Sequence, residues 1–276
     1  MTKLCCILAW QADTGVIFRR GPGKLIRLIG WNLKTHSFEP GQWFKGQIYV
    51  RKSDLSPDGT KLVYYAAKFR APLLTWIAIS SPPFLTAVVL WEASGTWNDL
   101  SLFETNTVLA LATYRADSTI DPYAGFAVPH QLTVKPKPWP GCFHKLADHD
   151  RLIRDGWVVH SGDPVYRARL AKHAEPVVYR KCGIARFQPA YLDMSAVDDA
   201  TVSYSFCEAP GGAAELNADW AEMRGNDLLF SRGGKLFCRT SRKVAKRLVY
   251  DGPREIADFG DMTFEPVEAP GWAKTW

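Results

Sequence analysis

The sequence lacks the short motifs that identify several large enzyme classes. It contains neither the Gly-x-Ser-x-Gly elbow of α/β-hydrolases nor the His-Glu-x-x-His pattern of zinc proteases. The glycine-rich pieces Gly21-Pro22-Gly23 and Gly211-Gly212 lack both the Lys-Ser/Thr of a phosphate loop and the triple-glycine fingerprint of dinucleotide sites. We interpret both pieces as turns, so the sequence carries no signature of these classes.

Long apolar runs are also missing. The N-terminal stretch Leu4 to Trp10 and the run Phe84 to Trp91 are much shorter than the roughly 20 residues of a membrane-spanning helix. The N-terminal stretch is not followed by a small-residue cleavage site, which argues against a secretory signal. We therefore expect no membrane anchor and no secretion, and predict a cytoplasmic protein.

The cysteine spacing contains no metal or redox motif. No pair has the two-residue separation of zinc knuckles and redox sites, and a chain of 276 residues does not depend on disulfides to fold. Because several cysteines lie in apolar runs, we expect buried free thiols in a reducing compartment. The six are Cys5, Cys6, Cys142, Cys182, Cys207 and Cys238.

Apolar and aromatic residues, by contrast, are abundant. They make up 47% and 13% of the chain, with 11 tryptophans, which favours a sizeable core built from strands. The formal charge of +6 and the pI near 9.0 suit an acidic partner. The densest basic cluster, Arg242-Lys243 with Lys246-Arg247, precedes the apolar run Leu248 to Tyr250, and we interpret it as a solvated loop or edge.

Short β-prone runs separated by turns recur through the first part of the chain about every 8 to 12 residues, a spacing typical of all-β folds. The double proline Pro82-Pro83 ends one such run, and Pro40-Gly41 predicts a turn in a loop pinned by flanking aromatic residues. We expect strands within Cys5–Trp10, Lys24–Trp31, Gln47–Arg51, Leu62–Ala67, Leu74–Ser80, Phe84–Trp91, Leu102–Phe103, Val108–Leu111, Trp157–Val159, Pro176–Tyr179, Tyr191–Met194 and Thr201–Phe206.

The best-defined turn is Ser56-Pro57-Asp58-Gly59. Pro57 presets φ, Asp58 can hydrogen-bond its own backbone, and Gly59 accepts the positive φ that closes the turn. The β-branched and aromatic residues after it predict a strand, so Ser53 to Lys68 reads as a hairpin. We interpret Asp54 and Asp58 as turn residues rather than as catalytic carboxylates.

This hairpin resembles the Ser-Pro-Asp-Gly hairpin of β-propeller blades, as in the Tol-type and tryptophan–aspartate repeat propellers. Asn217 to Arg239 repeats its order of polar lead-in, Asp/Gly turn and apolar strand, and Phe38-Glu39-Pro40 recurs as Phe264-Glu265-Pro266. The chain is also similar over most of its length to a group of uncharacterised bacterial proteins with comparable GQWFKG, DLSPDG and FEPVEAPGWA segments. The repeats and the resemblance predict an all-β, single propeller-like domain over residues 1–276, with five or six blades of about 45 residues each.

The middle of the chain departs from this pattern. Lys135 to Gly141 is proline-rich and cannot pair in a central strand. His144 to Asp155 then predicts a helix with an apolar stripe of Leu146, Leu152 and Ile153, and Gly156 stands where a left-handed cap belongs. We expect a helical insertion at about 139–156; the alternative is two packed β domains joined near 135–141.

Potential chemistry gathers near this helix. His144, Asp148 and His149 could approach one another, but the spacing of five between the two histidines does not match a helical zinc motif. Cys142 with His144 or His160 could form a nucleophilic pair, although no family signature surrounds this cysteine. We favour the polar face of a surface helix and expect no metal, cofactor or catalytic residue here.

Aromatic and cationic residues around the same helix point to protein binding. Trp and Arg are enriched at the energetic centres of protein interfaces. The alternative is that the aromatic residues anchor the insertion to the rest of the domain. The predicted partner-binding residues are Trp139, Phe143, Lys145, Arg151, Arg154 and Trp157.

These observations favour a non-catalytic protein-binding scaffold over an enzyme. The most specific version is an immunity or inhibitor protein that occludes a partner toxin or effector. One alternative is a hydrolase or lyase with its site in the funnel of the propeller. A second alternative, a nucleic-acid-binding module, requires a continuous Lys/Arg stripe, and the dispersed basic residues make us disfavour it.

Overall fold

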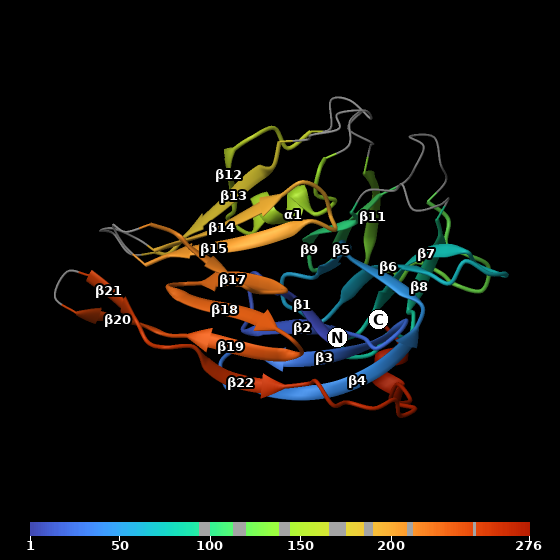
Figure 1. Ribbon diagram of the computed structural model, residues 1–276. Helices are drawn as coiled ribbons and strands as arrows, with labels where there is room; N and C mark the ends of the chain where they lie inside the picture. Colours follow the sequence, from blue (N-terminus) through green and yellow to red (C-terminus); the bar gives the residue numbers. More distant parts are fainter. Residues whose placement is uncertain are drawn as a thin grey trace. The chain divides into compact units, whose positions relative to one another are not determined.

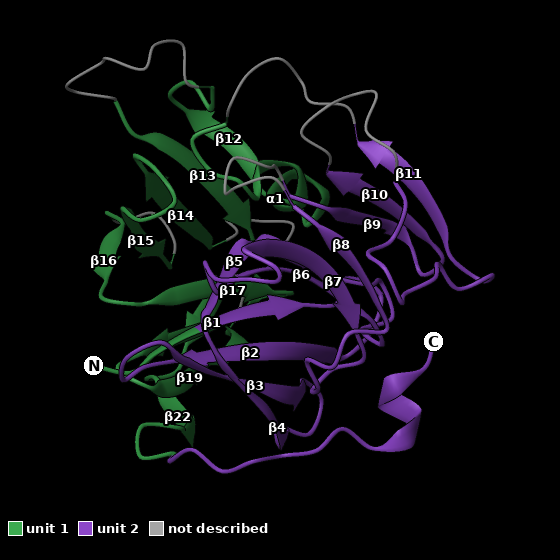
Figure 2. Cartoon of the chain, turned by 90° about the vertical axis from the view of Figure 1, so that its right-hand side faces the viewer, with its two compact units in different colours: residues 1–4, 142–262 green, residues 5–141, 263–276 purple. Residues whose placement is uncertain are grey.

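The computed structural model describes residues 1–93, 100–112, 120–137, 144–165, 175–184, 190–208, 212–244 and 247–276, without the side chain of Arg247. Within these ranges the structure is nearly all β, with one α-helix of six residues and one 3₁₀ turn, which confirms the all-β class (Figure 1). Contacts divide the chain into two compact units (Figure 2). Unit 1 comprises residues 1–4 and 142–262, and unit 2 comprises residues 5–141 and 263–276.

The described part of unit 2 contains three sheets built from strands that follow one another in the chain. From the second strand onward, neighbouring strands within a sheet pair antiparallel, except the last two, which pair in parallel. The strands are β1 (Lys3–Leu8), β2 (Thr14–Arg20), β3 (Leu25–Asn32) and β4 (Ser37–Lys45); β5 (Gln47–Leu55), β6 (Leu62–Ala67), β7 (Thr75–Ser80) and β8 (Val89–Glu92); and β9 (Leu102–Thr105), β10 (Val108–Ala112) and β11 (Thr133–Lys137). The 3₁₀ turn η1 (Gly271–Lys274) follows near the C-terminus.

The alternation of side chains along β2 and β3 creates the core of this unit. Val16 and Phe18 on β2, and Ile26 and Leu28 on β3, are buried in one hydrophobic cluster. Successive strand residues point to opposite faces of a sheet, so residues two apart share the core side. The sequence-based expectation of a strand at 24–31 is confirmed, whereas β2 was missed.

The predicted Ser-Pro-Asp-Gly hairpin is confirmed. The amide of Gly59 donates to the carbonyl oxygen of Ser56 over 2.8 Å, and Gly59 has a φ of +76°. The Asp58 carboxylate accepts from the Ser56 hydroxyl over 2.7 Å and from the Thr60 amide over 3.0 Å. Burial raises the pKa of Asp58, but these hydrogen bonds outweigh it and bring the pKa below its usual value.

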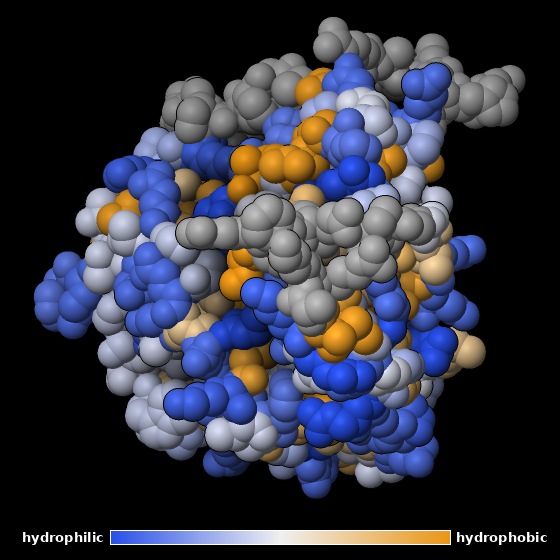
Figure 3. Space-filling model, turned by 90° about the vertical axis from the view of Figure 1, so that its left-hand side faces the viewer, coloured by the Kyte–Doolittle hydropathy of each residue, from blue (hydrophilic) through white to orange (hydrophobic). Residues whose placement is uncertain are grey.

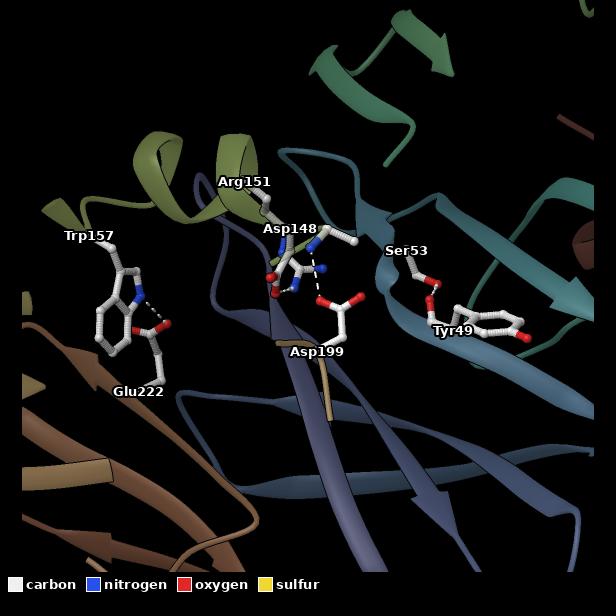
Figure 4. Close-up of polar contacts among 8 residues, drawn as sticks. Tyr49, Ser53, Asp148, Arg151, Trp157, Asp199 and Glu222 are labelled. Atoms are coloured by element: carbon white, nitrogen blue, oxygen red, sulfur yellow. Dashed lines mark hydrogen bonds and ion pairs between the residues drawn. The ribbon is translucent and has the colours of Figure 1, made fainter. Parts of the chain in front are cut away.

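Asp54, expected to be a turn residue, instead lies inside β5. Its side chain is buried, and its Oδ2 accepts a hydrogen bond from the amide of Phe103 on β9 over 2.9 Å. The ladder between β5 and β6 shifts register between Tyr49 and Asp54, and the Ser53 hydroxyl donates to the Tyr49 carbonyl within the irregular segment (Figure 4). Asp54 is therefore a structural tie between two strands.

The predicted turn at Pro40-Gly41 is wrong, because both residues lie in strand β4. This strand is at the edge of its sheet, where the missing amide of a proline does not interrupt a central ladder. The pairing with β3 shifts register between Arg27 and Ile29, opposite this dipeptide. The turn dipeptide therefore produces an irregularity in an edge strand rather than a loop.

The strand expected over Phe84–Trp91 is shorter than predicted, because only its end belongs to β8. The amides of Leu85 and Thr86 donate instead to the side-chain Oε1 of Gln42, over 2.8 and 3.0 Å. A backbone whose donors are satisfied by a side chain does not form a ladder. A glutamine more than 40 residues earlier in the chain thus sets where β8 begins.

The described part of unit 1 contains two larger sheets and a separate hairpin. Its residues 1–4 group with the later strands, as seen where the Ser231 hydroxyl donates to the carbonyl oxygen of Leu4 over 2.8 Å. The sheets are β12 (Val158–Ser161), β13 (Val177–Cys182), β14 (Tyr191–Ala196), β15 (Val202–Cys207) and β16 (Ala214–Leu216); β17 (Trp220–Arg224), β18 (Asp227–Arg232), β19 (Lys235–Arg239) and β22 (Arg254–Asp258); and the hairpin β20 (Ser241–Val244) and β21 (Arg247–Tyr250).

The segment Asn217 to Arg239, which repeats the order of residues in the Ser53–Lys68 hairpin, forms two consecutive hairpins. β17 pairs with β18 around Gly225, and β18 pairs with β19 around Gly233-Gly234, all three glycines having positive φ. The inward residues of these strands, such as Leu228 and Phe230, join the core cluster of unit 1.

The predicted helix is shorter than His144–Asp155: α1 spans His149–Arg154. His144 forms a β-bridge with Val165, and the amide of Lys145 donates to the carbonyl oxygen of Pro164 over 2.7 Å, so this backbone is held away from the helix. The cap is confirmed, since Gly156 has a φ of +92°. Of the expected stripe, Leu146 and Leu152 are buried, whereas Ile153 is 44% exposed.

The expected propeller is not confirmed. The described sheets are all open, and the first and last strands, β1 and β22, belong to different sheets. The boundary between the units falls at residues 141 and 142, next to the proline-rich segment. That division does not test whether the units act as one domain, so the single domain stays a prediction. Among the described residues, no helix is both long and apolar enough to cross a membrane.

Candidate functional site

The six predicted partner-binding residues do not form a surface cluster in the described structure. Trp139 and Phe143 lie outside the described residues. Lys145, Arg151 and Trp157 are buried within unit 1, with exposed fractions of 7%, 7% and 2%. Of the side chains predicted to bind a partner, these three therefore offer little surface in the described structure.

Trp157 is part of the core of unit 1. Its ring packs in the same hydrophobic cluster as Leu146 and Tyr179. Its indole Nε1 donates to Oε2 of Glu222 over 3.1 Å, while Oε1 of Glu222 pairs with Lys181 over 2.7 Å (Figure 4). A buried tryptophan with a satisfied N–H is an anchor, which supports the alternative that this aromatic residue fixes the helical segment.

The basic residues of the segment have partners inside unit 1. The Lys145 ammonium donates to the carbonyl oxygen of Glu175 over 2.6 Å, and Arg151 pairs with the buried Asp148 over 2.7 Å (Figure 4). Arg154, which is mostly buried, pairs with Asp155 over 2.9 Å. Partner binding by these residues stays a prediction, but their charges are already compensated within the fold.

His144 and His149 do come together, in a geometry that disfavours a shared metal. Their rings stack with centroids 4.2 Å apart and planes 19° from parallel, and Nδ1 of His149 lies 2.7 Å from the Tyr179 hydroxyl. Imidazole binds a metal in the plane of its ring, so stacked rings direct their lone pairs side by side rather than at one point. The described residues contain no group of three or more His, Cys, Asp or Glu side chains arranged to hold a metal.

Two of the described cysteines, Cys6 and Cys238, do not have the features of reactive nucleophiles. Cys142 lies outside the described residues, and the other five are free thiols. Burial raises the pKa of Cys6 well above its usual value and that of Cys238 to about 11. Since the thiolate is the nucleophile, both buried groups remain protonated at neutral pH.

The hairpin β20–β21 contains Arg242, Lys243 and Arg247 of the basic cluster that the sequence predicts to be a solvated loop or edge (Figure 1). Its base is held firmly: Oδ1 of Asp227 accepts from both the amide and the hydroxyl of Ser241, over 2.8 and 3.0 Å. Tyr250 is buried in the core of unit 1, and Arg239 lies over its ring at 5.8 Å. The ladder pairs Ser241 with Tyr250 and Lys243 with Leu248 on the face of the hairpin that packs inward.

The opposite face of this hairpin presents apolar and basic residues to solvent. Arg242 pairs with Val249 in the ladder, and Val244 pairs with Arg247. Val244 and Val249 are 45% and 37% exposed, and Arg242 has a 64% exposed side chain that reaches Asp251 over 3.3 Å. We call this face, with Arg242, Val244 and Val249, the ribbon face.

Figure 3 shows hydrophilic residues interspersed with separate hydrophobic areas on one side of the molecule. In the sequence, the basic pairs Arg242-Lys243 and Lys246-Arg247 stand on either side of Val244-Ala245, and Lys246 lies outside the described residues. Because this pairwise pattern has no period of two, it does not indicate a strand with one exposed face.

Comparisons with known proteins assign no family. No protein-family model matches the chain, and no curated protein matches it. One solved structure, that of an uncharacterised protein from Listeria monocytogenes EGD-e, is similar with 10% identity and a TM-score of 0.27, over 92% of this chain and 66% of that protein. The chain thus spans less than two thirds of that protein, and the likeness carries no assigned activity.

Proposed function

We propose that this protein is a non-catalytic, protein-binding scaffold that contacts its partner through the ribbon face. The observation that carries the proposal is the pair of exposed valines on a hairpin with a rigid base. Val244 and Val249 lie on the side away from the core, while Tyr250 and the Asp227–Ser241 hydrogen bonds hold the hairpin in place. A preorganised hairpin loses little conformational freedom when a partner binds.

The composition of the ribbon face favours a partner surface that is both apolar and acidic. Burial of the two valines against an apolar surface contributes favourably to the free energy of binding. Arg242 can exchange its exposed contact with Asp251 for a contact with a carboxylate of the partner. A nucleic acid would use the basic residues but would leave the valines without apolar contacts. A protein partner therefore accounts for more of the exposed side chains than a nucleic acid does.

The finer architecture and role follow as parts of the same proposal. Five groups of strands, β1–β4, β5–β8, β9–β11, β12–β16 and β17–β22, succeed one another along the chain, which is the order expected of propeller blades. A blade-built scaffold offers many loops and hairpins for binding. We propose that its specific role is that of a cytoplasmic immunity or inhibitor protein, which occludes a toxin or effector.

Native co-expression with the neighbouring genes tests this function. The ribbon variant Val244→Asp with Val249→Asp replaces two exposed apolar contacts by charges that repel an acidic partner. The control variant Val158→Asp with Ile184→Asp makes the same chemical change at positions that are 57% and 77% exposed in the same unit. Affinity-purified complexes and their dissociation constants are then compared.

The expected result is a stoichiometric protein partner that wild type and control variant retain alike. The ribbon variant binds it at least about 30-fold more weakly, because truncated interface centres typically cost about 2 kcal/mol. If the partner is toxic, only wild type and control protect the cells that produce it. The absence of a partner, or equal binding by the ribbon variant, contradicts the proposal.

A further inference from the structure

Unit 2 contains a hollow of about 320 Å³ that the proposed function does not use. It lies over one face of the β2–β3–β4 sheet, with Pro82 and Pro83 as its opposite wall. The volume is at the lower end of the range of ligand pockets, about 300 to 1,000 Å³. The hollow is therefore large enough for a small organic molecule.

Gly30 is one of the residues that line the hollow. The ladders place Gly30 between Val16 on β2 and Glu39 on β4, on the face that Pro83 covers. A Cβ added to Gly30 would lie 3.6 Å from Cβ of Pro83 and 3.6 Å from Cβ of Glu39. These are ordinary van der Waals distances, so a Cβ at this position fits between the sheet and the proline wall, and a larger side chain there would take up space in the hollow.

The proline wall is held in position by β4. The Gln42 amide donates to the carbonyl oxygen of Pro83 over 3.1 Å, and Oε1 of Gln42 accepts from Leu85 and Thr86. The hollow therefore has two fixed sides, a sheet and a tethered turn. A preformed cavity of this kind requires little reorganisation to accept a ligand.

The polar lining contains one charged group. Thr14, Asn32, Ser37 and Glu39 come from the three adjacent strands, and among the lining residues Glu39 alone carries a formal charge. No hydrogen bond or ion pair to the side-chain carboxylate of Glu39 occurs among the described residues. The Oδ1 of Asn32 accepts from the amides of Lys34 and Thr35, over 3.0 Å in each case, which leaves its NH₂ group to donate outward.

We propose that this hollow binds a small organic cation, specifically a primary ammonium group attached to a compact apolar body. The Glu39 carboxylate receives the ammonium, while the rings of Pro82 and Pro83 contact the apolar body. Because the protein carries a formal charge of +6, a cation gains little from the overall field. Recognition therefore depends on this one carboxylate and on the shape of the hollow.

A pair of probes of equal shape tests the proposal. Isobutylammonium chloride and neutral isobutanol are titrated separately into the full-length protein at constant ionic strength, with ¹⁵N–¹H correlation spectra as the readout. We expect saturable shifts at the amides of Gly15, Gly30 and Glu39 with the ammonium. Isobutanol should bind at least about threefold more weakly, because an exposed ion pair contributes up to about a factor of five.

Three variants separate the contribution of the Glu39 charge to probe binding from that of the shape of the hollow. Glu39→Gln should weaken the ammonium to the level of isobutanol, whereas Glu268→Gln, which changes an exposed carboxylate of the same unit outside the hollow, should leave both probes unchanged. Gly30→Val should abolish the shifts of both probes, with a folded spectrum elsewhere. Equal affinity for the two probes, unchanged binding by Glu39→Gln, or no saturable shift in wild type overturns the proposal.

Discussion

Two segments of unit 1 carry lysine, arginine and aromatic residues in opposite environments. Residues 144–157 carry Lys145, Arg151, Arg154 and Trp157 together with three aspartates, and residues 241–250 carry Arg242, Lys243 and Tyr250 and no acidic residue. In the first segment, Trp157 and the first two of these cations are buried, whereas in the second Arg242 is largely exposed. The acceptors within reach of the cations therefore differ between the two segments.

The polar groups of the first segment have specific acceptors, some within the segment, such as Asp148 for Arg151, and some in distant parts of the chain. Trp157 has Glu222, and Lys145 has the Glu175 carbonyl oxygen. A buried polar group that is hydrogen-bonded avoids most of its desolvation cost. In the second segment, only the base has such partners, so the ribbon face stays in solvent. Each substitution predicted below changes a residue in one of these two segments.

The largest effect is expected from Trp157→Ala. Removing the buried ring leaves a cavity in the core of unit 1, and such truncations cost about 3 to 5 kcal/mol of the free energy of unfolding. Val249→Ala, on the ribbon face, should change that free energy by no more than about 0.5 kcal/mol. Urea denaturation followed by far-UV circular dichroism measures both values.

If Trp157→Ala fails to fold, Trp157→Phe provides the same comparison. It keeps most of the ring but removes the donor to Glu222, which should cost about 1 to 2 kcal/mol. A value for either Trp157 variant as small as that of Val249→Ala would refute the assignment of Trp157 to the core.

The next largest effect on the free energy of unfolding is expected when a buried arginine, rather than an exposed one, is replaced. Arg151→Ala leaves the carboxylate of Asp148 buried without its pair, and loss of one partner of a buried ion pair costs about 3 kcal/mol. Arg242→Ala removes an exposed contact with Asp251 and should cost less than about 0.5 kcal/mol. Thermal and urea unfolding measure the difference, and similar values for the two variants would contradict the contrast.

The smallest effect at neutral pH is expected from Tyr250→Phe. The Tyr250 hydroxyl is buried and has no hydrogen-bond partner among the described residues, so its removal should change the free energy of unfolding by no more than about 1 kcal/mol. The ring, which packs on Phe206, is retained.

Stability measurements at alkaline pH give a more sensitive comparison of Tyr250→Phe with wild type. Burial, followed by the charges of Asp227 and Glu208, raises the pKa of Tyr250 to about 12, against the opposing effect of Arg239. Since free tyrosine has a pKa of about 10, the folded state favours the protonated phenol, and this stabilisation is lost as the pH rises from about 10 through about 12. Tyr250→Phe should lose less stability than wild type over this window, and parallel curves would show that Tyr250 does not contribute.

Local turn chemistry made parts of the fold predictable. The Ser56–Gly59 turn, the hairpins around Gly225 and Gly233-Gly234, and the cap at Gly156 follow from residues that are adjacent in sequence. Long-range contacts decided what was mispredicted. The Gln42 side chain delays the start of β8, and the bridge between His144 and Val165 shortens α1.

The functional residues were harder to predict than the strands. Tryptophan and arginine near a helix indicated an interface, but the same residues stabilise a core when acceptors such as Glu222 lie opposite. The hollow above Gly30 was not predictable, because its wall comes from Pro82 and Pro83, some 50 residues later. A glycine in a strand pattern does not reveal whether a neighbour fills its space.

By itself, the sequence determined the all-β class and the hairpins, because period-two alternation and turn residues act over a few positions. Only the tertiary structure decided which cations are buried, which valines face solvent and where a cavity remains. Burial and pairing depend on side chains that are far apart in the chain, and their positions follow from the packing of whole sheets. The same lysine, arginine and aromatic residues therefore form a core in one segment and an exposed face in another.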